Sequence, residues 1–206
     1  MDDKENGTVN EAHGEIPEER IFFFDVQEVS LHDFEASGYI LDIGGGGEGI
    51  IGRLKGEQVI AIDPSKRELE EAPSGPLKVV MDARDLQFLD SAFLTATAFF
   101  TLMYIKASDQ ERVFGEVFRV LKPGGRLLIW EAVLPPRLDE EKEIAAFPLI
   151  VSLLGEELEV AYGALWPTRK QNLSYYLAMA AKVAFEVVDQ WEKDHILFLE
   201  LAKPQS

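Results

Sequence analysis

The sequence contains no cysteine and only three histidines among its 206 residues. Disulfides, thiolate metal sites and a cysteine nucleophile are therefore excluded. The histidines, His13, His32 and His195, are too scattered to suggest a histidine-based metal site, and no metal is expected. Basic residues are also scarce, with 20 Lys and Arg against 37 Asp and Glu and a formal net charge of −17. This balance disfavours nucleic acid and anionic membranes as partners, because both require a basic surface.

Long apolar segments are missing as well. The longest uncharged run, Ser91–Ile105, has 15 residues and is too short to span a bilayer comfortably. The first twenty residues are acidic and polar and lack the basic and apolar regions of a targeting signal, so a cytoplasmic protein is expected. The negative charge is concentrated in residues 1–39, with 11 acids and 2 bases, whereas residues 40–134 have a net charge of only −3.

This charge distribution and the length predict a simple domain organisation. Residues 1–20 are expected to form an acidic N-terminal arm, either a solubilising tail or a lid over a site. Residues 21–206 are expected to form one domain with a β-hairpin insert over 149–163. Apolar residues make up 47% of the chain, which is enough for a sizeable core.

From residue 39 onward, short apolar runs alternate with amphipathic stretches, which indicates βαβ units and a parallel sheet. Capping-box spacing predicts helices after Ser65 and Ser108, and a further helix capped by Thr168 and Gln171. The hairpin is expected to turn at Gly155 and Glu156. Seven strands of the main sheet are predicted, over residues 39–43, 59–63, 77–81, 95–100, 126–133, 184–191 and 195–202.

The last two of these strands are joined by the short charged turn 192–194, and a tight connection makes such a pair antiparallel. The predicted fold class is therefore α/β, with a Rossmann-like, seven-stranded and mostly parallel sheet. It has an antiparallel terminal strand, helices on both faces and the hairpin insert.

Four successive glycines follow the first predicted strand, in the segment Asp42–Gly49. Such a run is costly in chain entropy for an ordinary turn, and it lets a ligand approach the backbone closely near a helix N-terminus. Gly44, Gly46 and Gly49 match the dinucleotide pattern G-x-G-x-x-G, and Asp63 follows at the distance of a ribose-binding acid. This pattern alone fits an enzyme that uses nicotinamide or flavin.

Three features favour a different ligand. Asp42 stands two positions before the first glycine, where it would face a pyrophosphate unfavourably, and a second acid, Asp82, ends the third predicted strand. The predicted sheet also ends in an antiparallel pair, where a doubly wound dehydrogenase would continue with parallel units.

With these features in place, the sequence resembles the class I S-adenosylmethionine-dependent methyltransferases. The resemblance covers about residues 39–134, and the predicted terminal helix with residues 185–188 and 197–201 extends it to the end of the chain. The matching motifs are Ile40-Leu-Asp-Ile-Gly-Gly-Gly46, Val59-Ile-Ala-Ile-Asp63, Met81-Asp-Ala83 and Arg119-Val-Leu-Lys-Pro-Gly-Gly125. Their order and spacing carry the resemblance, because each motif alone is weak.

The resemblance implies a role for each matching residue toward S-adenosylmethionine as cofactor. Gly44 and Gly46 would pass beneath the methionine part and Asp42 would lie near its ammonium. Asp63 would accept hydrogen bonds from the ribose hydroxyls. The remaining cofactor-binding candidates are Pro64 beside the adenine, Asp82 and Ala83 at its amino group and ring, and Phe100 and Thr101 at the methyl-donor end. Acids suit this ligand, which is cationic and lacks phosphates.

For other residues near the expected site, the sequence leaves more than one role open. The family usually has a third loop glycine where this chain has Glu48, so either the loop is one residue longer or Glu48 replaces that glycine. Glu48 either contacts the methionine ammonium or lies in the first helical turn. Tyr104 and Glu131 are candidates for a general base, and either could instead only shape the pocket. The hairpin and Trp166 are expected either to cover an acceptor pocket or to form a homodimer surface. Aromatics such as Tyr162 and Trp166 are more often core residues than part of a ligand cage.

The leading prediction is an enzyme that transfers a methyl group to a small-molecule acceptor by in-line displacement. One alternative is a nicotinamide-dependent oxidoreductase. The other is a regulatory protein that binds S-adenosylmethionine without turnover. The acceptor itself is not indicated by the sequence.

Overall fold

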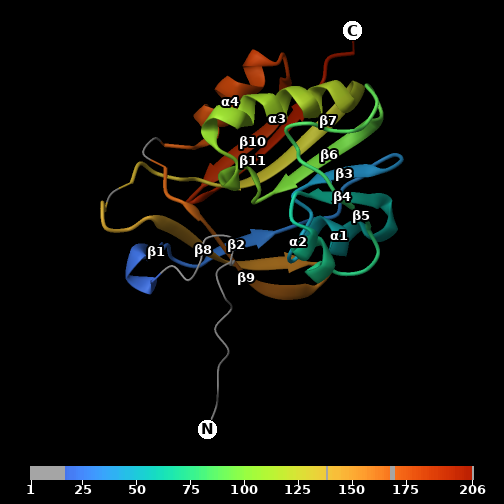
Figure 1. Ribbon diagram of the computed structural model, residues 1–206. Coiled ribbons are helices and arrows are strands. Elements are labelled where there is room, and N and C mark those ends of the chain that lie inside the picture. The colour runs from blue at the N-terminus through green and yellow to red at the C-terminus, as the bar shows by residue number, and fades with distance from the viewer. Residues whose placement is uncertain (1–16, 138, 168–169, 206) are drawn as a thin grey trace. The chain divides into compact units, whose positions relative to one another are not determined.

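The computed structural model describes residues 17–137, 139–167 and 170–205 (Figure 1). The chain contacts form two compact units, which are described separately. The smaller unit comprises Met1–His32 and Leu134–Lys170, and the larger comprises Asp33–Val133 and Gln171–Ser206. The predicted arm over 1–20 falls largely outside the described residues, and the predicted division into an arm and one domain stays a prediction.

The larger unit is built on a seven-stranded sheet with the order β10-β11-β7-β6-β3-β4-β5. Strands β3, β4, β5, β6 and β7 are parallel to one another, β11 is antiparallel to β7, and β10 is antiparallel to β11. The sheet confirms the predicted fold class. Its strands are β3 (Ile40–Ile43), β4 (Val59–Asp63), β5 (Leu77–Val80), β6 (Phe93–Phe99), β7 (Leu121–Ala132), β10 (Glu186–Lys193) and β11 (Ile196–Ala202).

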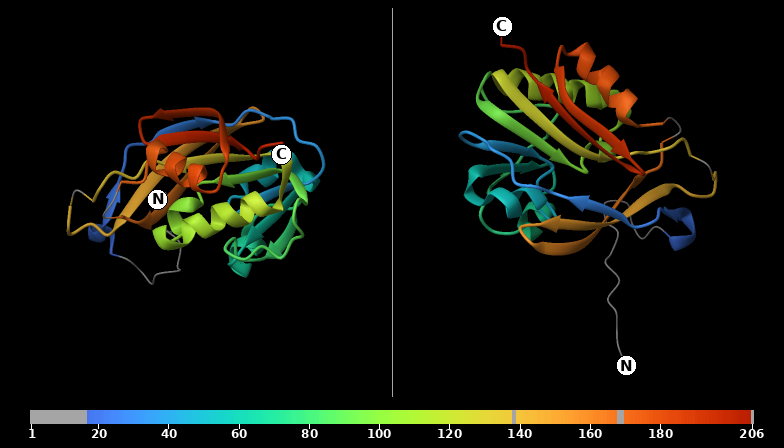
Figure 2. Two further views of the ribbon diagram at one scale, coloured as in Figure 1. Left: turned by 90° about the horizontal axis from the view of Figure 1, so that it is seen from above. Right: turned by 180° about the vertical axis from the view of Figure 1, so that it is seen from behind.

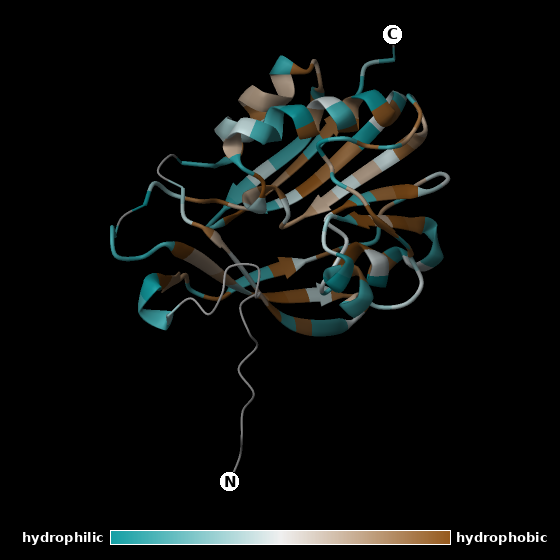
Figure 3. Ribbon diagram, viewed as in Figure 1, coloured by the Kyte–Doolittle hydropathy of each residue, from teal (hydrophilic) through white to brown (hydrophobic). Residues whose placement is uncertain are grey.

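Helices flank this sheet in two pairs. Helices α1 (Ile50–Lys55) and α2 (Lys66–Glu71) pack near β4 and β5, whereas α3 (Ala107–Val120) and α4 (Leu173–Lys182) contact each other and lie over β7, β10 and β11 (Figure 2). The central strands β3 and β4 are largely hydrophobic (Figure 3), as expected for parallel strands covered on both faces.

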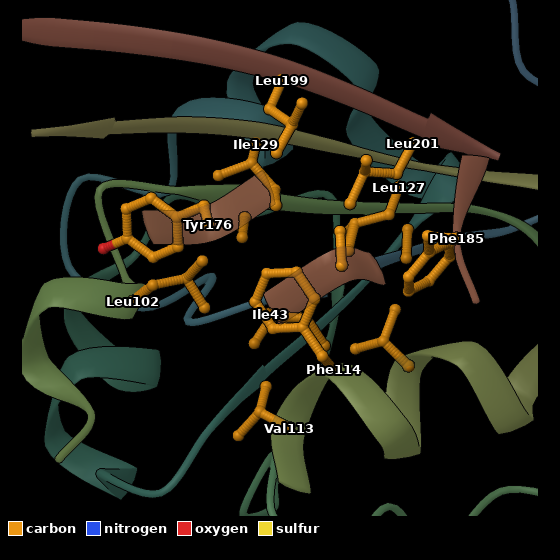
Figure 4. Packing of buried hydrophobic residues seen from close by; sticks show 14 of the residues in the cluster. Ile43, Leu102, Val113, Phe114, Leu127, Ile129, Tyr176, Phe185, Leu199 and Leu201 are labelled. Carbon is orange, nitrogen blue, oxygen red and sulfur yellow. The ribbon is translucent and has the colours of Figure 1, made fainter. Parts of the chain in front are cut away.

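The core of the larger unit lies between the sheet and helices α3 and α4. Ile43 from β3 and Ile129 from β7 point toward Phe114 of α3 and Tyr176 of α4, and all four side chains are buried (Figure 4). Since side chains alternate along a strand, Asp42 points to the other face from Leu41 and Ile43. This alternation places a carboxyl group at the carboxyl end of an otherwise apolar strand.

Local capping signals were only partly correct. Ser65 caps α2 as predicted, with its hydroxyl accepting from the Glu68 N–H at 3.3 Å. The cap predicted at Ser108 is wrong, because α3 already begins at Ala107 without a side-chain cap. Helix α4 is capped by Asn172 rather than Gln171, and Thr168 lies outside the described residues.

The smaller unit contains a second sheet around the long strand β8 (Ile144–Leu153). Strands β1 (Ile21–Phe23) and β2 (Gln27–Ser30) run parallel to β8, and β9 (Glu156–Leu165) is antiparallel to it. The sequence predicted only the hairpin part of this sheet. Rings of Phe22, Phe24, Phe147 and Trp166 pack together within the unit.

The hairpin is longer than predicted and its turn is one residue earlier. Leu153 pairs with Glu156, which leaves Leu154 and Gly155 as the two-residue loop. Both have positive φ, 52° and 84°, as a type I′ turn requires. The prediction placed glycine first, as a type II′ turn needs, but Gly155 occupies the second position and Leu154 adopts the left-handed conformation.

Candidate functional site

The glycine loop joins β3 to α1 and folds over the end of β4. The N–H groups of Gly44 and Gly45 both donate to the carbonyl of Ile62, at 2.8 and 3.0 Å. Gly44 has φ of 71°, and a Cβ on it would lie 2.4 Å from Thr101 Oγ1. A Cβ on Gly46 would lie 2.6 Å from Glu68 Cβ. Both positions therefore require glycine for close backbone approach.

Asp42 is a buried acid next to this loop. Its side chain is 3% exposed, and Thr97 donates its hydroxyl proton to Oδ1 at 2.7 Å. The pKa of Asp42 is raised to about 7, mainly by burial; the Thr97 hydrogen bond opposes this rise, and the negative charge of Asp63 adds a smaller increase. A cation placed beside Asp42 would stabilise the carboxylate form.

Asp63 ends β4, next to Asp42 in the sheet. Its Oδ1 accepts the N–H of Ser65 at 2.7 Å, and its Oδ2 lies 3.1 Å from the position of a Cβ on Gly46. Burial raises the pKa of Asp63, and the charge of Glu68 adds to this, while the N–H groups of Ser65 and Gly46 lower it. Pro64 follows in an exposed position.

Asp82 follows β5 one strand further along and differs from the other two acids. Its carboxylate accepts from Arg84 Nε at 2.9 Å and from the Arg84 backbone N–H at 2.8 Å. Hydrogen bonding to Arg84 lowers the pKa of Asp82. An adenine amino group would therefore have to share this carboxylate with Arg84. Ala83 lies between the two residues and is half-buried.

The chain after β6 borders the glycine loop. Phe100 is buried with a φ of 47°, a left-handed conformation that turns the chain at the sheet edge. Thr101 Oγ1 lies 3.1 Å from the carbonyl oxygens of Ile43 and Phe99, to one of which it can donate. Thr101 thus contacts the end of β3 where Gly44 begins.

The two candidate bases have different surroundings. Tyr104 is 51% exposed and lies in the short turn Leu102–Tyr104. Glu131 is fully buried, and its carboxylate accepts backbone N–H groups from Leu102 at 2.6 Å and Ala132 at 2.9 Å. This geometry favours a role for Glu131 in holding the backbone over one in proton transfer.

The arrangement brings most of the predicted residues to one edge of the sheet. The contacts link the glycine loop with Asp42, Asp63 and Thr101, while Asp82 and Ala83 follow the adjoining strand β5. Glu48 precedes Gly49, the residue before α1, so its predicted place in the first helical turn is wrong.

Sequence reasoning missed three residues of this region. Thr97 holds Asp42, Glu68 faces Gly46 and Asp63, and a Cβ on Gly45 would lie 2.6 Å from Asp42 Oδ2. A threonine within the apolar strand β6, at the register position beside Asp42, was the available signal for Thr97.

No group of three or more His, Cys, Asp or Glu side chains among the described residues could hold a metal ion. None of the helices in the described part of the chain is long and apolar enough to cross a membrane.

Comparison with known proteins matches a segment of the larger unit to a protein family. Residues 41–129 match the family model described as Methyltransferase domain. A demethylmenaquinone methyltransferase of Thermus thermophilus is 43% identical over 56 residues, which are 27% of this chain. The matched segment spans only 24% of that relative's length.

Solved structures share the fold. An S-adenosylmethionine-dependent methyltransferase from Mesorhizobium loti has a TM-score of 0.58 at 16% identity, over 82% of this chain and 94% of that one. Phosphoethanolamine N-methyltransferase 2 of Haemonchus contortus, in complex with S-adenosyl-L-methionine, has a TM-score of 0.59 at 18% identity, over 84% of this chain and 50% of that one. Residues 41–129 of this chain thus match a methyltransferase domain, and its sheet has the fold of S-adenosylmethionine-dependent methyltransferases.

Proposed function

We propose that this chain transfers a methyl group from S-adenosylmethionine to a small-molecule acceptor. The observation that carries the proposal is the set of three acids, Asp42, Asp63 and Asp82, at the ends of the adjacent parallel strands β3, β4 and β5. Ligands of open α/β sheets bind at this edge. A ligand with a cationic sulfur and an ammonium fits acids there, whereas a pyrophosphate would face repulsion from them.

The residues present fit the cofactor in charge. The lack of a side chain at Gly44 and Gly46 also lets the loop backbone pack closely against Thr101 and Glu68. We assign the methionine part to this loop, its ammonium to Asp42, and the ribose hydroxyls to Asp63. Pro64, Asp82 and Ala83 are assigned to the adenine, and Phe100 and Thr101 to the methyl-donor end.

When bound, S-adenosylmethionine supplies a methyl group on a cationic sulfur, and the acceptor takes it by in-line displacement while the carbon–sulfur electron pair stays on sulfur. The protein's own contribution is alignment, which can supply much of the rate enhancement in such reactions. Asp63 and the glycine loop fix the two ends of the cofactor. Where the acceptor atom must lose a proton, the half-exposed Tyr104 is better placed to take it than the buried Glu131.

The proposal extends to the surroundings of the enzyme. We propose neither nucleic acid nor an anionic membrane as partner, because the chain carries a net charge of −17. A cytoplasmic location stays a prediction. A homodimer through the hairpin stays a prediction, whereas Trp166 is 4% exposed and packs against Phe22 and Phe24 inside the smaller unit.

Ligand-induced thermal shifts test the cofactor. S-adenosylhomocysteine should raise the melting temperature of the wild-type chain, whereas NAD should not, because binding to the folded state alone stabilises it. A shift with NAD and none with S-adenosylhomocysteine would refute the proposal in favour of an oxidoreductase.

Turnover needs a second experiment. The chain is incubated with S-adenosylmethionine carrying a labelled methyl group and with metabolite extracts. Label appearing in a small molecule supports the proposed transfer and identifies the acceptor. A chain that binds S-adenosylhomocysteine but labels nothing across a broad screen would instead be a binding protein without turnover.

A further inference from the structure

The short turn Leu102–Tyr104, which follows β6, is held by two buried polar side chains from other elements. Glu131, near the end of β7, accepts the N–H groups of Leu102 and Met103 at 2.6 and 3.3 Å. Gln110, in α3, donates through Nε2 to the carbonyls of Leu102 and Ile105 at 2.8 and 3.0 Å. Glu131 therefore binds backbone N–H groups of the turn, and Gln110 binds backbone carbonyls at its start and just after its end.

Gln110 is itself fixed by a further contact. The hydroxyl of Tyr175, in α4, donates to Gln110 Oε1 at 2.9 Å. Both Gln110 and Glu131 are 0% exposed. Burying an amide and a carboxyl group is costly unless each is hydrogen-bonded, so apolar residues at these two positions would fill the core more simply. Their contacts instead fix one conformation of one turn.

The position of this turn connects it with the cofactor loop. Thr101 immediately precedes Leu102, and its side chain lies where a Cβ on Gly44 would project, 2.4 Å from Oγ1. Moving the turn would therefore move Thr101 against the glycine loop. The contact lies beside the end of β3, whereas Asp63 lies at the end of the neighbouring strand β4.

We propose that Glu131 and Gln110 are positioning residues that set the turn Leu102–Tyr104, and through Thr101 the part of the site that receives the methionine end of the cofactor. The inference rests on the proposed function, which assigns that end of the cofactor to Gly44 and Thr101. The inference divides the cofactor site into an adenosine part and a methionine part. The adenosine part depends on Asp63, and the methionine part depends on the held turn.

Calorimetry with two ligands tests this separation. S-adenosylhomocysteine carries both parts, whereas 5′-methylthioadenosine carries the adenosine and lacks the amino acid. Glu131→Gln keeps the side-chain size but replaces one acceptor oxygen by a donor that faces a backbone N–H. We expect it to weaken S-adenosylhomocysteine about tenfold, while 5′-methylthioadenosine changes by less than about twofold. A general loss of structure would weaken both ligands together.

Three further variants complete the design. Tyr175→Phe removes only the hydroxyl that holds Gln110, retains the ring, and should give the same selective loss at about threefold. Asp189→Asn is the control, because Asp189 also accepts a backbone N–H, that of Gln190 at 2.8 Å, on β10 at the far end of the sheet from β5. It should leave both affinities unchanged. Asp63→Ala should weaken both ligands.

The outcomes distinguish the inference from the function on which it rests. Selective loss in Glu131→Gln, or in Tyr175→Phe where the former does not fold, supports the positioning role. Equal loss of both ligands, or no loss, in folded variants overturns it while leaving cofactor binding intact. Wild-type protein that binds neither ligand overturns the proposed function and this inference with it.

Discussion

Replacing Asp42 by asparagine should change how the stability of the ligand-free protein depends on pH. The Asp42 carboxyl is buried, and its pKa rises from 3.8 to about 7 on folding. Between these values the unfolded chain has released the proton that the folded chain still holds. The free energy of unfolding of the wild type therefore falls as pH rises through this window, and it stops falling above about pH 7. An asparagine side chain does not titrate and cannot contribute this dependence.

The size of the effect follows from the same shift. About three pKa units at 1.4 kcal/mol per unit give a ceiling of roughly 4 kcal/mol over the whole window. Between pH 5.5 and 8, away from the pI of about 4.5 where solubility falls, the share is about 2 kcal/mol. The Asp42→Asn variant should gain this amount relative to wild type. Burial also raises the pKa of Glu131 to about 7, but that contribution is present in both proteins and cancels.

Urea unfolding of both proteins at the two pH values measures the difference directly. The change with pH is the informative quantity, because the absolute offset also contains the cost of burying the asparagine amide. Asp85→Asn, at an exposed carboxyl, controls for the exchange itself. A difference between Asp42→Asn and wild type that stays constant from pH 5.5 to 8, or that shrinks, would refute the assignment of a raised pKa.

Three other predictions concern separate residues. Asp63→Ala should weaken S-adenosylhomocysteine at least about tenfold by calorimetry, since two hydrogen bonds to a charged acceptor are lost, and unchanged affinity would remove the ribose assignment. Gly46→Ala places a Cβ 2.6 Å from Glu68 Cβ and should lower the free energy of unfolding, measured in urea, by about 1 to 3 kcal/mol. Gly115→Ala adds a Cβ with nothing within 4 Å and should instead raise the melting temperature by about 2 to 4 °C. Leu154→Asn should also raise it by about 2 to 4 °C, because Leu154 is exposed and has φ of 52°; calorimetric melting that shows a decrease would contradict this interpretation of the turn.

The main sheet was predictable because its strands are short, apolar and separated by strong local signals. The glycine run after Ile43 and the cap at Ser65 each mark a boundary, and the observed strands begin and end within one or two residues of the predicted ones there. Burial on both faces imposes this composition on parallel strands. The order of the strands and helices could therefore be predicted from the sequence.

The second sheet was not predictable for the opposite reason. Strand β1 has three residues and β2 has four, and both pair with β8, which lies more than a hundred residues later. Their local patterns are too short to distinguish a strand from a loop. Only the hairpin between β8 and β9, whose strands are close in sequence, left a recognisable signal.

At the candidate site, the sequence predicts where the acids lie but not whether they are ionised. The sequence places Asp42, Asp63 and Asp82 at strand ends, but the protonation of each depends on its surroundings. Burial raises the pKa of Asp42 and of Asp63, whereas Arg84 lowers that of Asp82. The ligand-free edge therefore carries less negative charge near neutral pH than three carboxylates imply. A cation bound beside Asp42 would restore that charge by displacing its proton. The number of acids in the sequence therefore gives the charge of the ligand-bound site better than that of the empty site.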